Sequence, residues 1–262
     1  MPRCSDMAVF NLLDASRLPA CTRAAVFLDF DGTLVDLAPT PDSIAVPDAL
    51  DTLLSDLSRC LEGAIALVSG RSVSDIVHHL PGYTGIIVGG HGAEWRVGAA
   101  VEPRVNVNSD GLSVLTDSAH AFAENHPGTL LERKPTGAVL HYRSGPTMKS
   151  HVEQIADELV AQHPEFEAHP AKMAMELRPK GVGKDKALAD LMAMPPFKGR
   201  TPLMIGDDTT DEPALIWAQA RGGLGIKVGE GDSQAHHRLA DPNAVRTVLT
   251  HWAKEHRTCL AD

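Results

Sequence analysis

The stretch Ala24-Ala25-Val26-Phe27-Leu28-Asp29-Phe30-Asp31-Gly32-Thr33 decides the fold that we expect for this sequence. An unbroken apolar run over 24–28 is typical of a strand that is buried on both faces of a parallel sheet. The run ends at acidic residues and a glycine, a combination that favours a turn. We therefore predict a buried parallel strand that presents Asp29 and Asp31 at its carboxyl end.

The chain after this stretch alternates between strands and helices, as a parallel sheet requires. Leucines at helical spacing over 46–60 follow Pro47, which suits the first turn of a helix. The strands expected after that helix are 64–68, 86–88, 203–205 and 224–228. The expected helices are 72–79, 184–192, one that follows Asp211 and a terminal one that begins at Pro242. This order predicts an α/β protein with a doubly wound, Rossmann-like parallel sheet.

A different pattern interrupts this order between residues 106 and 178. Two helices are expected over 112–124 and 149–162, and three strands over 130–134, 139–143 and 172–178. These strands alternate between polar and apolar residues, as in a sheet with one face in water. We predict a catalytic core formed by 23–105 and 179–262, a smaller inserted α+β cap domain over 106–178, and an N-terminal tail over 1–22.

Charge and composition exclude several classes of protein. A formal net charge of −10 argues against a nucleic-acid binder, because such proteins need a basic surface to displace counterions. The sequence has no apolar run long enough to span a membrane and no export leader, so we expect no membrane partner and a cytoplasmic location. The four cysteines are widely spaced and form no C-x-x-C pair, which argues against a zinc ribbon or a redox motif.

Aspartates gather where the predicted strands end, and ligands bind at that edge of a parallel sheet. The second strand leads into Ser69, and the strand over 203–205 leads into Gly206-Asp207-Asp208-Thr209-Thr210-Asp211. One aspartate after a strand is often only a turn former or a helix cap. Several carboxylates around one crevice, however, would raise one another's pKa and repel unless a cation lay between them. Because every candidate ligand is an oxygen, we expect Mg²⁺ as the cofactor.

Four parts of the sequence resemble, in order, the four motifs of the haloacid dehalogenase superfamily: Asp29-Phe30-Asp31-Gly32-Thr33, Ser69, Lys184 and Gly206-Asp207-Asp208. The insert over 106–178 resembles the type C2 caps of that superfamily. The resemblance implies a phosphatase in which Asp29 is the nucleophile and forms an aspartyl-phosphate. Asp31 would protonate the leaving oxygen and then activate water. The spacing is chemically reasonable, because an acid two residues after the nucleophile lies on a turn and can reach past it.

The same resemblance assigns the metal ligands and the phosphoryl contacts. Asp29, the main-chain carbonyl of Asp31 and Asp207 would hold Mg²⁺. The remaining residues would act around them: Asp208 and Asp211 would support the metal ligands, and Ser69 and Lys184 would bind the phosphoryl group. Lys184 follows the turn Gly181-Val182-Gly183, which favours it over Lys186, although a lysine at a helix start can also be merely solvated.

The predicted cap strands carry charged residues on one face. Glu132 and Lys134 lie on one strand, His141 and Arg143 on the next, and Glu176 on the third. Such a face is often simply solvated. If it faced a crevice, it would suit a ligand with many hydroxyl groups, which need donors as well as acceptors.

Several blocks of the sequence resemble the trehalose-6-phosphate phosphatases. These blocks are Ser69-Gly70-Arg71, Gly90-His91-Gly92-Ala93-Glu94, Leu140-His141-Tyr142-Arg143, Met175-Glu176-Leu177-Arg178-Pro179 and Gly206-Asp207-Asp208-Thr209-Thr210-Asp211-Glu212. The resemblance implies a sugar-phosphate substrate that is contacted by Glu132, Lys134, His141, Arg143 and Glu176 from the cap and by Arg71 and His91 at the crevice. Asp185 departs from the glycine that many relatives carry after the motif lysine.

Other functions stay open on this evidence. The cap could instead serve a phosphatase for sucrose phosphate or for a mannosyl phosphate, and a phosphomutase would share the core. From a different class, an inactive domain could sense a sugar phosphate without hydrolysing it. The presence of Asp31 argues against a sensor, because binding alone needs no acid at that position. We expect a monomer or a weak homo-oligomer.

Overall fold

The computed structural model describes residues 15–38, 43–105, 108–171 and 173–257. These residues form two compact units. The first unit comprises the described parts of 1–67, 80–85 and 188–262, and the second comprises those of 68–79 and 86–187. Most of the predicted tail and Lys172, the first residue of a predicted cap strand, lie outside the described residues. The division into core and cap at residues 106 and 178 stays a prediction.

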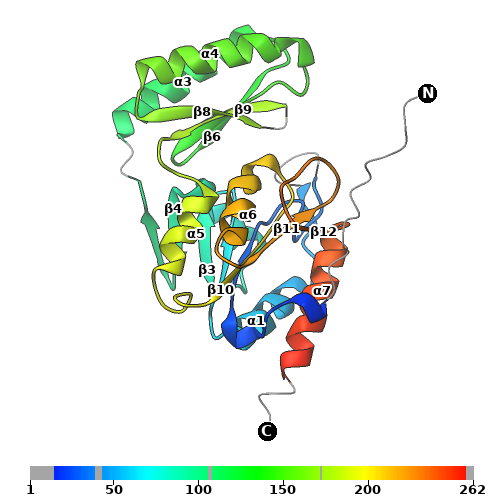
Figure 1. Ribbon diagram of the computed structural model, residues 1–262. Helices are drawn as coiled ribbons and strands as arrows, with labels where there is room; N and C mark the ends of the chain where they lie inside the picture. Colours follow the sequence, from blue (N-terminus) through cyan, green and yellow to red (C-terminus); the bar gives the residue numbers. More distant parts are fainter. Residues whose placement is uncertain (1–14, 39–42, 106–107, 172, 258–262) are drawn as a thin grey trace, which may run out of the picture. The chain divides into compact units, whose positions relative to one another are not determined.

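A parallel sheet is the framework of the first unit (Figure 1). Its strands run in the order β12 (His237–Leu239), β11 (Leu224–Val228), β10 (Thr201–Gly206), β1 (Ala24–Leu28) and β2 (Ile65–Val68), of which Val68 already belongs to the second unit. β1 pairs with β10 on one side and with β2 on the other, and each of its residues is fully buried. This interior position explains the unbroken apolar run over 24–28.

Helices flank this sheet, and the predicted α/β fold class is confirmed. α1 (Leu50–Cys60) packs against α7 (Pro242–Arg257), and α6 (Glu212–Gln219) packs against β10 and β11. The start of α1 differs from the prediction, because the helix begins at Leu50. Pro47 precedes the helix in a turn, where its carbonyl oxygen accepts the N–H of Leu50 at 2.9 Å.

The second unit begins with α2 (Val73–His79), which packs against β3 (Ile86–Gly89). β3 continues into an antiparallel meander with β4 (Glu94–Val97) and β5 (Ala100–Pro103). The sequence predicted β3 but neither β4 nor β5, so the strands of this protein are not all parallel. Four-residue strands are too short to show a clear alternation of polar and apolar residues.

A separate antiparallel sheet lies in the second unit, with strand order β6-β7-β9-β8. Its strands are β6 (Leu130–Lys134), β7 (Gly137–His141), β8 (Phe166–Ala171) and β9 (Ala174–Pro179). Two helices, α3 (Ser109–Asn125) and α4 (Lys149–Gln162), cover one face of this sheet (Figure 1). The sequence did not predict β8, which contains Pro170. The strand forms because β8 lies at the edge of the sheet, where a missing N–H is tolerated.

No helix among the described residues is both long and apolar enough to cross a membrane. A disulfide bond joins Cys21, which precedes β1, to Cys60 at the end of α1. Both cysteines are 2% exposed. The wide spacing of the cysteines gave no reason to expect this bond, because residues 39 positions apart in sequence meet only through the tertiary fold.

We expect the variant Cys60→Ser to lower the free energy of unfolding by about 2–4 kcal/mol, because the disulfide restricts the unfolded chain. Urea unfolding of both proteins, with and without dithiothreitol, measures this effect. Reductant should destabilise the parent and leave Cys60→Ser unchanged. If the urea midpoint of the parent were the same with and without dithiothreitol, the disulfide would not be stabilising.

Candidate active site

Aspartates from two adjacent strands meet in the first unit. Asp29 follows β1 and Asp207 follows β10, and the two strands end in register because Leu28 pairs with Ile205. Asp29, Asp207 and Asp211 each offer a carboxylate oxygen, and these oxygens lie within 4.8 Å of one another. The structure therefore brings the predicted nucleophile and the predicted metal ligand together.

Two glycines permit this close approach. Gly32 has a φ of +72°, and a Cβ at this position would lie 2.1 Å from Oδ2 of Asp207. A Cβ on Gly206 would lie 2.4 Å from Cγ of Asp211. Any side chain at either position would push an aspartate out of the cluster.

Hydrogen bonds orient the aspartates. The hydroxyl of Thr33 donates to Oδ2 of Asp29 at 3.2 Å. Asp208 and Asp211 form a capping box around the short 3₁₀ helix η6 (Thr209–Asp211). In this box the N–H of Asp208 donates to Oδ2 of Asp211 at 3.0 Å. Asp211 thus contributes an oxygen to the cluster and is itself held from the backbone, whereas Asp208 serves as the helix cap.

Asp31, the predicted acid and base, is partly exposed in the turn that follows β1. The N–H of Gly32 donates to the carbonyl oxygen of Val35 at 2.8 Å, which closes this turn. The carboxylate of Asp31 is not one of the three clustered carboxylates. Its predicted metal contact uses the main-chain carbonyl instead and stays a prediction.

The donor set of the cluster fits Mg²⁺. Asp29 is 5% exposed and Asp211 is fully buried, so water screens their negative charges poorly. Three carboxylates at this spacing repel one another unless a cation lies between them. A small divalent ion that prefers oxygen ligands would offset the repulsion.

Sequence reasoning missed a cation beside this cluster. Lys227 of β11 is 5% exposed, and its ammonium group donates to the main-chain carbonyls of Asp207 and, at 2.9 Å, of Val228. The backbone of Asp207 is thereby anchored from the neighbouring strand. The available signal was one lysine inside the otherwise uncharged strand over 224–228.

The predicted phosphoryl-binding residues lie in the second unit. Ser69 is 1% exposed, and its Oγ accepts the N–H of Arg71 at 3.1 Å. Lys184 is the first residue of α5 (Lys184–Met192) and is 3% exposed, so it is not a solvated lysine. Its rival Lys186 is exposed. Because burial of an ammonium group is costly, a lysine held in this way needs negative charge nearby.

Polar side chains share one face of the four-stranded sheet. The register places Glu132 opposite Val139, and Val139 opposite Glu176, so the two acids lie in one row across three strands. Lys134 lies on the same face because it is two residues from Glu132. The opposite face carries apolar residues that pack in the core with α3 and α4: Leu131, Ala138, Leu140, Met175 and Leu177.

Glu176 is buried, with 6% of its surface exposed, and lies beside His91 and Lys134. Its Oε2 lies 3.0 Å from Nε2 of His91, and its Oε1 lies 4.0 Å from Nζ of Lys134. Lys134 also donates to the carbonyl oxygen of Gly70 at 2.9 Å. Burial raises the pKa of Glu176, but His91, Lys134 and Arg178 outweigh burial and bring the pKa to about 2. Glu176 is therefore ionised at neutral pH.

The remaining predicted sugar contacts lie at the β6 and β7 strands. Nε2 of His141 lies 2.8 Å from Oε2 of Glu132, and both side chains are partly exposed. The hydrogen bond from His141 lowers the pKa of Glu132, against the opposing effect of burial. Arg143 follows the end of β7 and is exposed.

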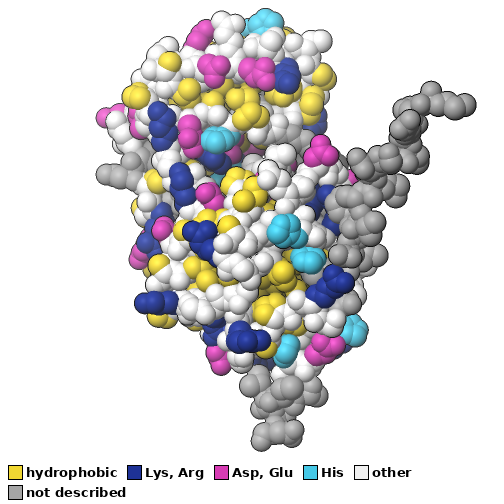
Figure 2. All heavy atoms as spheres, in the orientation of Figure 1, with side chains coloured by type: hydrophobic (Ala, Val, Ile, Leu, Met, Phe, Trp, Pro, Cys, Tyr) yellow, Lys and Arg dark blue, Asp and Glu magenta, His cyan; other side chains and the backbone are white. Residues whose placement is uncertain are grey.

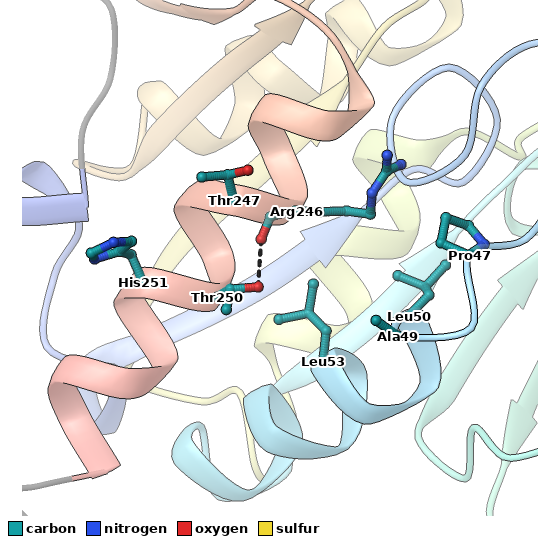
Figure 3. A pocket seen from close by; sticks show the side chains of 8 residues that line it. All are labelled: Pro47, Ala49, Leu50, Leu53, Arg246, Thr247, Thr250 and His251. Atoms are coloured by element: carbon teal, nitrogen blue, oxygen red, sulfur yellow. Dashed lines mark hydrogen bonds between the residues drawn. The ribbon is translucent and has the colours of Figure 1, made fainter.

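A groove elsewhere on the first unit lies between α1 and α7 (Figure 3). It has a volume of about 260 Å³ and is lined by Pro47, Ala49, Leu50, Leu53, Arg246, Thr247, Thr250 and His251. The lining includes no carboxylate and none of the predicted site residues.

On the face shown in Figure 2, acidic and basic side chains are interspersed.

The α/β fold is the one found in haloacid dehalogenase-like hydrolases, and aspartates lie at its strand ends. Solved structures with this fold include a haloacid dehalogenase-like hydrolase from Bacteroides thetaiotaomicron, with a TM-score of 0.63, 15% identity and coverage of 87% of this chain and 98% of that one. The crystal structure of a trehalose-6-phosphate phosphatase related protein has a TM-score of 0.73 and 28% identity, and covers 89% of this chain and 98% of that one.

Within this class, the chain belongs to the trehalose-phosphatase family, whose family profile matches residues 27–246. It is 34% identical to the trehalose-6-phosphate phosphatase of Escherichia coli K12 over 82% of this chain and 81% of that protein. It is 37% identical to a probable trehalose-phosphate phosphatase of Sinorhizobium fredii over 86% of each chain. The resemblance noted in the sequence is therefore confirmed.

Proposed function

We propose that this protein hydrolyses trehalose 6-phosphate to trehalose and phosphate through an aspartyl-phosphate on Asp29. The observation that carries the chemistry is the cluster of Asp29, Asp207 and Asp211 at the ends of β1 and β10. The substrate is supported by the name of the Escherichia coli relative, a trehalose-6-phosphate phosphatase that matches most of this chain.

The chemistry needs one nucleophile and one acid that becomes a base. A carboxylate oxygen of Asp29 attacks phosphorus, and the bond between phosphorus and the sugar oxygen breaks as Asp31 donates a proton to that oxygen. Asp31 then takes a proton from water, which attacks the aspartyl-phosphate and releases phosphate. Thr33 fixes the orientation of the nucleophile through its hydrogen bond to Oδ2 of Asp29.

A carboxylate approaches a phosphate dianion only where positive charge offsets their repulsion. Asp29, Asp207 and the main-chain carbonyl of Asp31 would hold Mg²⁺, which would supply such charge beside the phosphoryl oxygens. Other residues of the chain add to this environment: Asp208 and Asp211 keep the metal ligands in place, and Ser69 and Lys184 bind the phosphoryl group.

We assign the sugar to the polar residues of the second unit. Glu132, Lys134, His141, Arg143 and Glu176 contact its hydroxyl groups from the four-stranded sheet, with Arg71 and His91 beside them. The ionised Glu176 next to Lys134 offers both an acceptor and donors, as a polyhydroxylated ligand requires.

We infer a cytoplasmic protein that acts on a small molecule, without nucleic-acid or membrane partners, as a monomer or weak homo-oligomer. Disulfides persist mainly in oxidising compartments. Alkylation of free thiols after cells are quenched in acid and the protein is denatured therefore tests the location, because a reducing cytoplasm keeps the bond between Cys21 and Cys60 open until the protein is oxidised outside the cell.

Replacing the nucleophile should abolish turnover. Asp29→Asn should lower kcat at least about 10³-fold, because an amide is a poor nucleophile, while the folded structure persists. Phosphate release and a thermal unfolding scan measure the two properties, and acid-quenched parent enzyme should carry labelled phosphate that Asp29→Asn lacks. Activity within tenfold of the parent would refute the covalent mechanism.

The metal prediction can be tested without turnover. Calorimetric titration of the substrate-free protein should detect a Mg²⁺ site, and Asp207→Asn should weaken this binding at least about tenfold. Asp190→Asn, at an exposed position of α5, is the matched control and should bind Mg²⁺ as the parent does. Phosphatase activity that persists in excess chelator would argue against a magnesium enzyme.

The sugar assignment predicts a loss that depends on the substrate. Glu176→Ala should lower kcat/KM for trehalose 6-phosphate by a factor of about 10–1000, because one or two charge-assisted hydrogen bonds are lost. The loss on a small aryl phosphate, which has no sugar hydroxyls, should be at least about tenfold smaller. Glu167→Ala on the neighbouring strand β8 is the control and should show no such difference. Equal losses on both substrates would assign Glu176 to folding or to the chemical step.

A further inference from the structure

We propose that His91 is a positioning residue that, as a neutral imidazole, donates its Nε2–H to Glu176 and holds this carboxylate in the orientation that accepts a sugar hydroxyl. The inference rests on the proposed role of Glu176 in sugar binding. It replaces the direct contact with the substrate that the sequence predicted for His91 by an action through Glu176.

The contact between these side chains is secluded from solvent. Nε2 of His91 lies 3.0 Å from Oε2 of Glu176, and the two side chains are 9% and 7% exposed. An imidazole buried to this extent has little surface left for a ligand. Its ring is instead placed to fix the carboxylate, whose second oxygen faces Lys134 at 4.0 Å.

The backbone conformation at His91 places the imidazole ring next to Glu176. His91 has a φ of 55° and a ψ of 22°, a left-handed conformation that residues with a side chain rarely adopt. A Cβ on Gly70 would lie 2.5 Å from Nε2 of His91, so only glycine leaves room for the ring. Such strain persists where the surroundings determine the conformation, and it is typical of functional sites.

The hydrogen bonding of the ring indicates which nitrogen carries the proton. Nδ1 of His91 is buried and has no hydrogen-bond partner among the described residues. An imidazolium would leave a buried N–H donor unsatisfied at Nδ1, and an unpaired donor is rarer in proteins than an unpaired acceptor. The neutral form with the proton on Nε2 donates to Glu176 and leaves only a lone pair without a partner.

Burial of the ring favours the same protonation state, against the charge of Glu176. Burial lowers the pKa of His91, and Lys184 and Lys134 lower it further, whereas Glu176 raises it. The negative charge of Glu176 is therefore balanced by Lys134 and Arg178, both of which also lower its pKa. His91 contributes a directed hydrogen bond and no net charge.

The protonation state can be measured on the whole protein without substrate. Labelling the 13 histidines with ¹⁵N and comparing the spectrum with that of His91→Gln identifies the His91 signals. At pH 7 we expect a neutral ring with a proton on Nε2, and this form should persist below pH 6.5, where an unperturbed histidine becomes charged. An imidazolium at pH 7, or a proton on Nδ1, would overturn the proposal.

Kinetics of three substitutions test the positioning role. The measured quantity is the ratio of kcat/KM for trehalose 6-phosphate to that for a small aryl phosphate. His91→Asn tolerates the left-handed backbone but ends too short to reach Glu176, so this ratio should fall about 10–100-fold, as it should in His91→Ala. His91→Gln carries an amide donor at the position of Nε2. Its ratio should be at least about threefold higher than that of His91→Asn.

His169→Asn is the matched control, because His169 lies opposite Glu176 in the strand register but pairs with Glu167 at 2.9 Å. It should keep the parental ratio. If His91→Asn also keeps the ratio within threefold while Glu176→Ala loses it, the role of His91 is refuted and the sugar-binding role of Glu176 stands. If Glu176→Ala keeps the ratio, the proposed sugar-binding role fails instead, and the spectrum still decides how His91 is protonated.

Discussion

Repulsion between the carboxylates of Asp29, Asp207 and Asp211 is the constraint on which the catalytic end of the first unit depends. Pairing of the adjacent strands β1 and β10 brings the first two together, and the glycines at 32 and 206 leave room for Asp207 and Asp211. The surrounding structure resists this repulsion with directed hydrogen bonds from Thr33 and from the backbone of Asp208. What these bonds cannot supply is positive charge, and this explains why a site of this kind is suited to a divalent cation.

The second unit also holds a buried carboxylate, that of Glu176, but its charge is balanced by other residues of the chain. Glu176 is as buried as Asp29, yet its charge is balanced within the chain by Lys134 and Arg178 and oriented by His91. A carboxylate that is ionised at neutral pH and fixed in direction can distinguish hydroxyl groups by position, since misplaced donors leave it unsatisfied. The two units thus hold buried carboxylates in two different electrostatic settings: a cluster of three acids in the first and one acid beside cations in the second.

Sequence patterns predicted those elements whose local signal agrees with their place in the fold. The helices 149–162 and 184–192 and the strands 130–134 and 224–228 have the predicted bounds. The failures have structural causes. β8 contains a proline that only an edge position tolerates, and the start of α1 at Leu50 follows a turn at Pro47 that the leucine spacing does not reveal. The meander of β4 and β5 is too short for its alternation to stand out.

The sequence by itself determined the α/β class, the family and the identity of the acidic residues, because buried strands and strand-end motifs are local features of the chain. Only the tertiary structure decided which groups meet. The disulfide between Cys21 and Cys60, the lysine at 227 behind Asp207, and the pair of His91 with Glu176 each join residues far apart in sequence. The number of residues between them does not predict the contact, because only strand register and helix packing bring such side chains together.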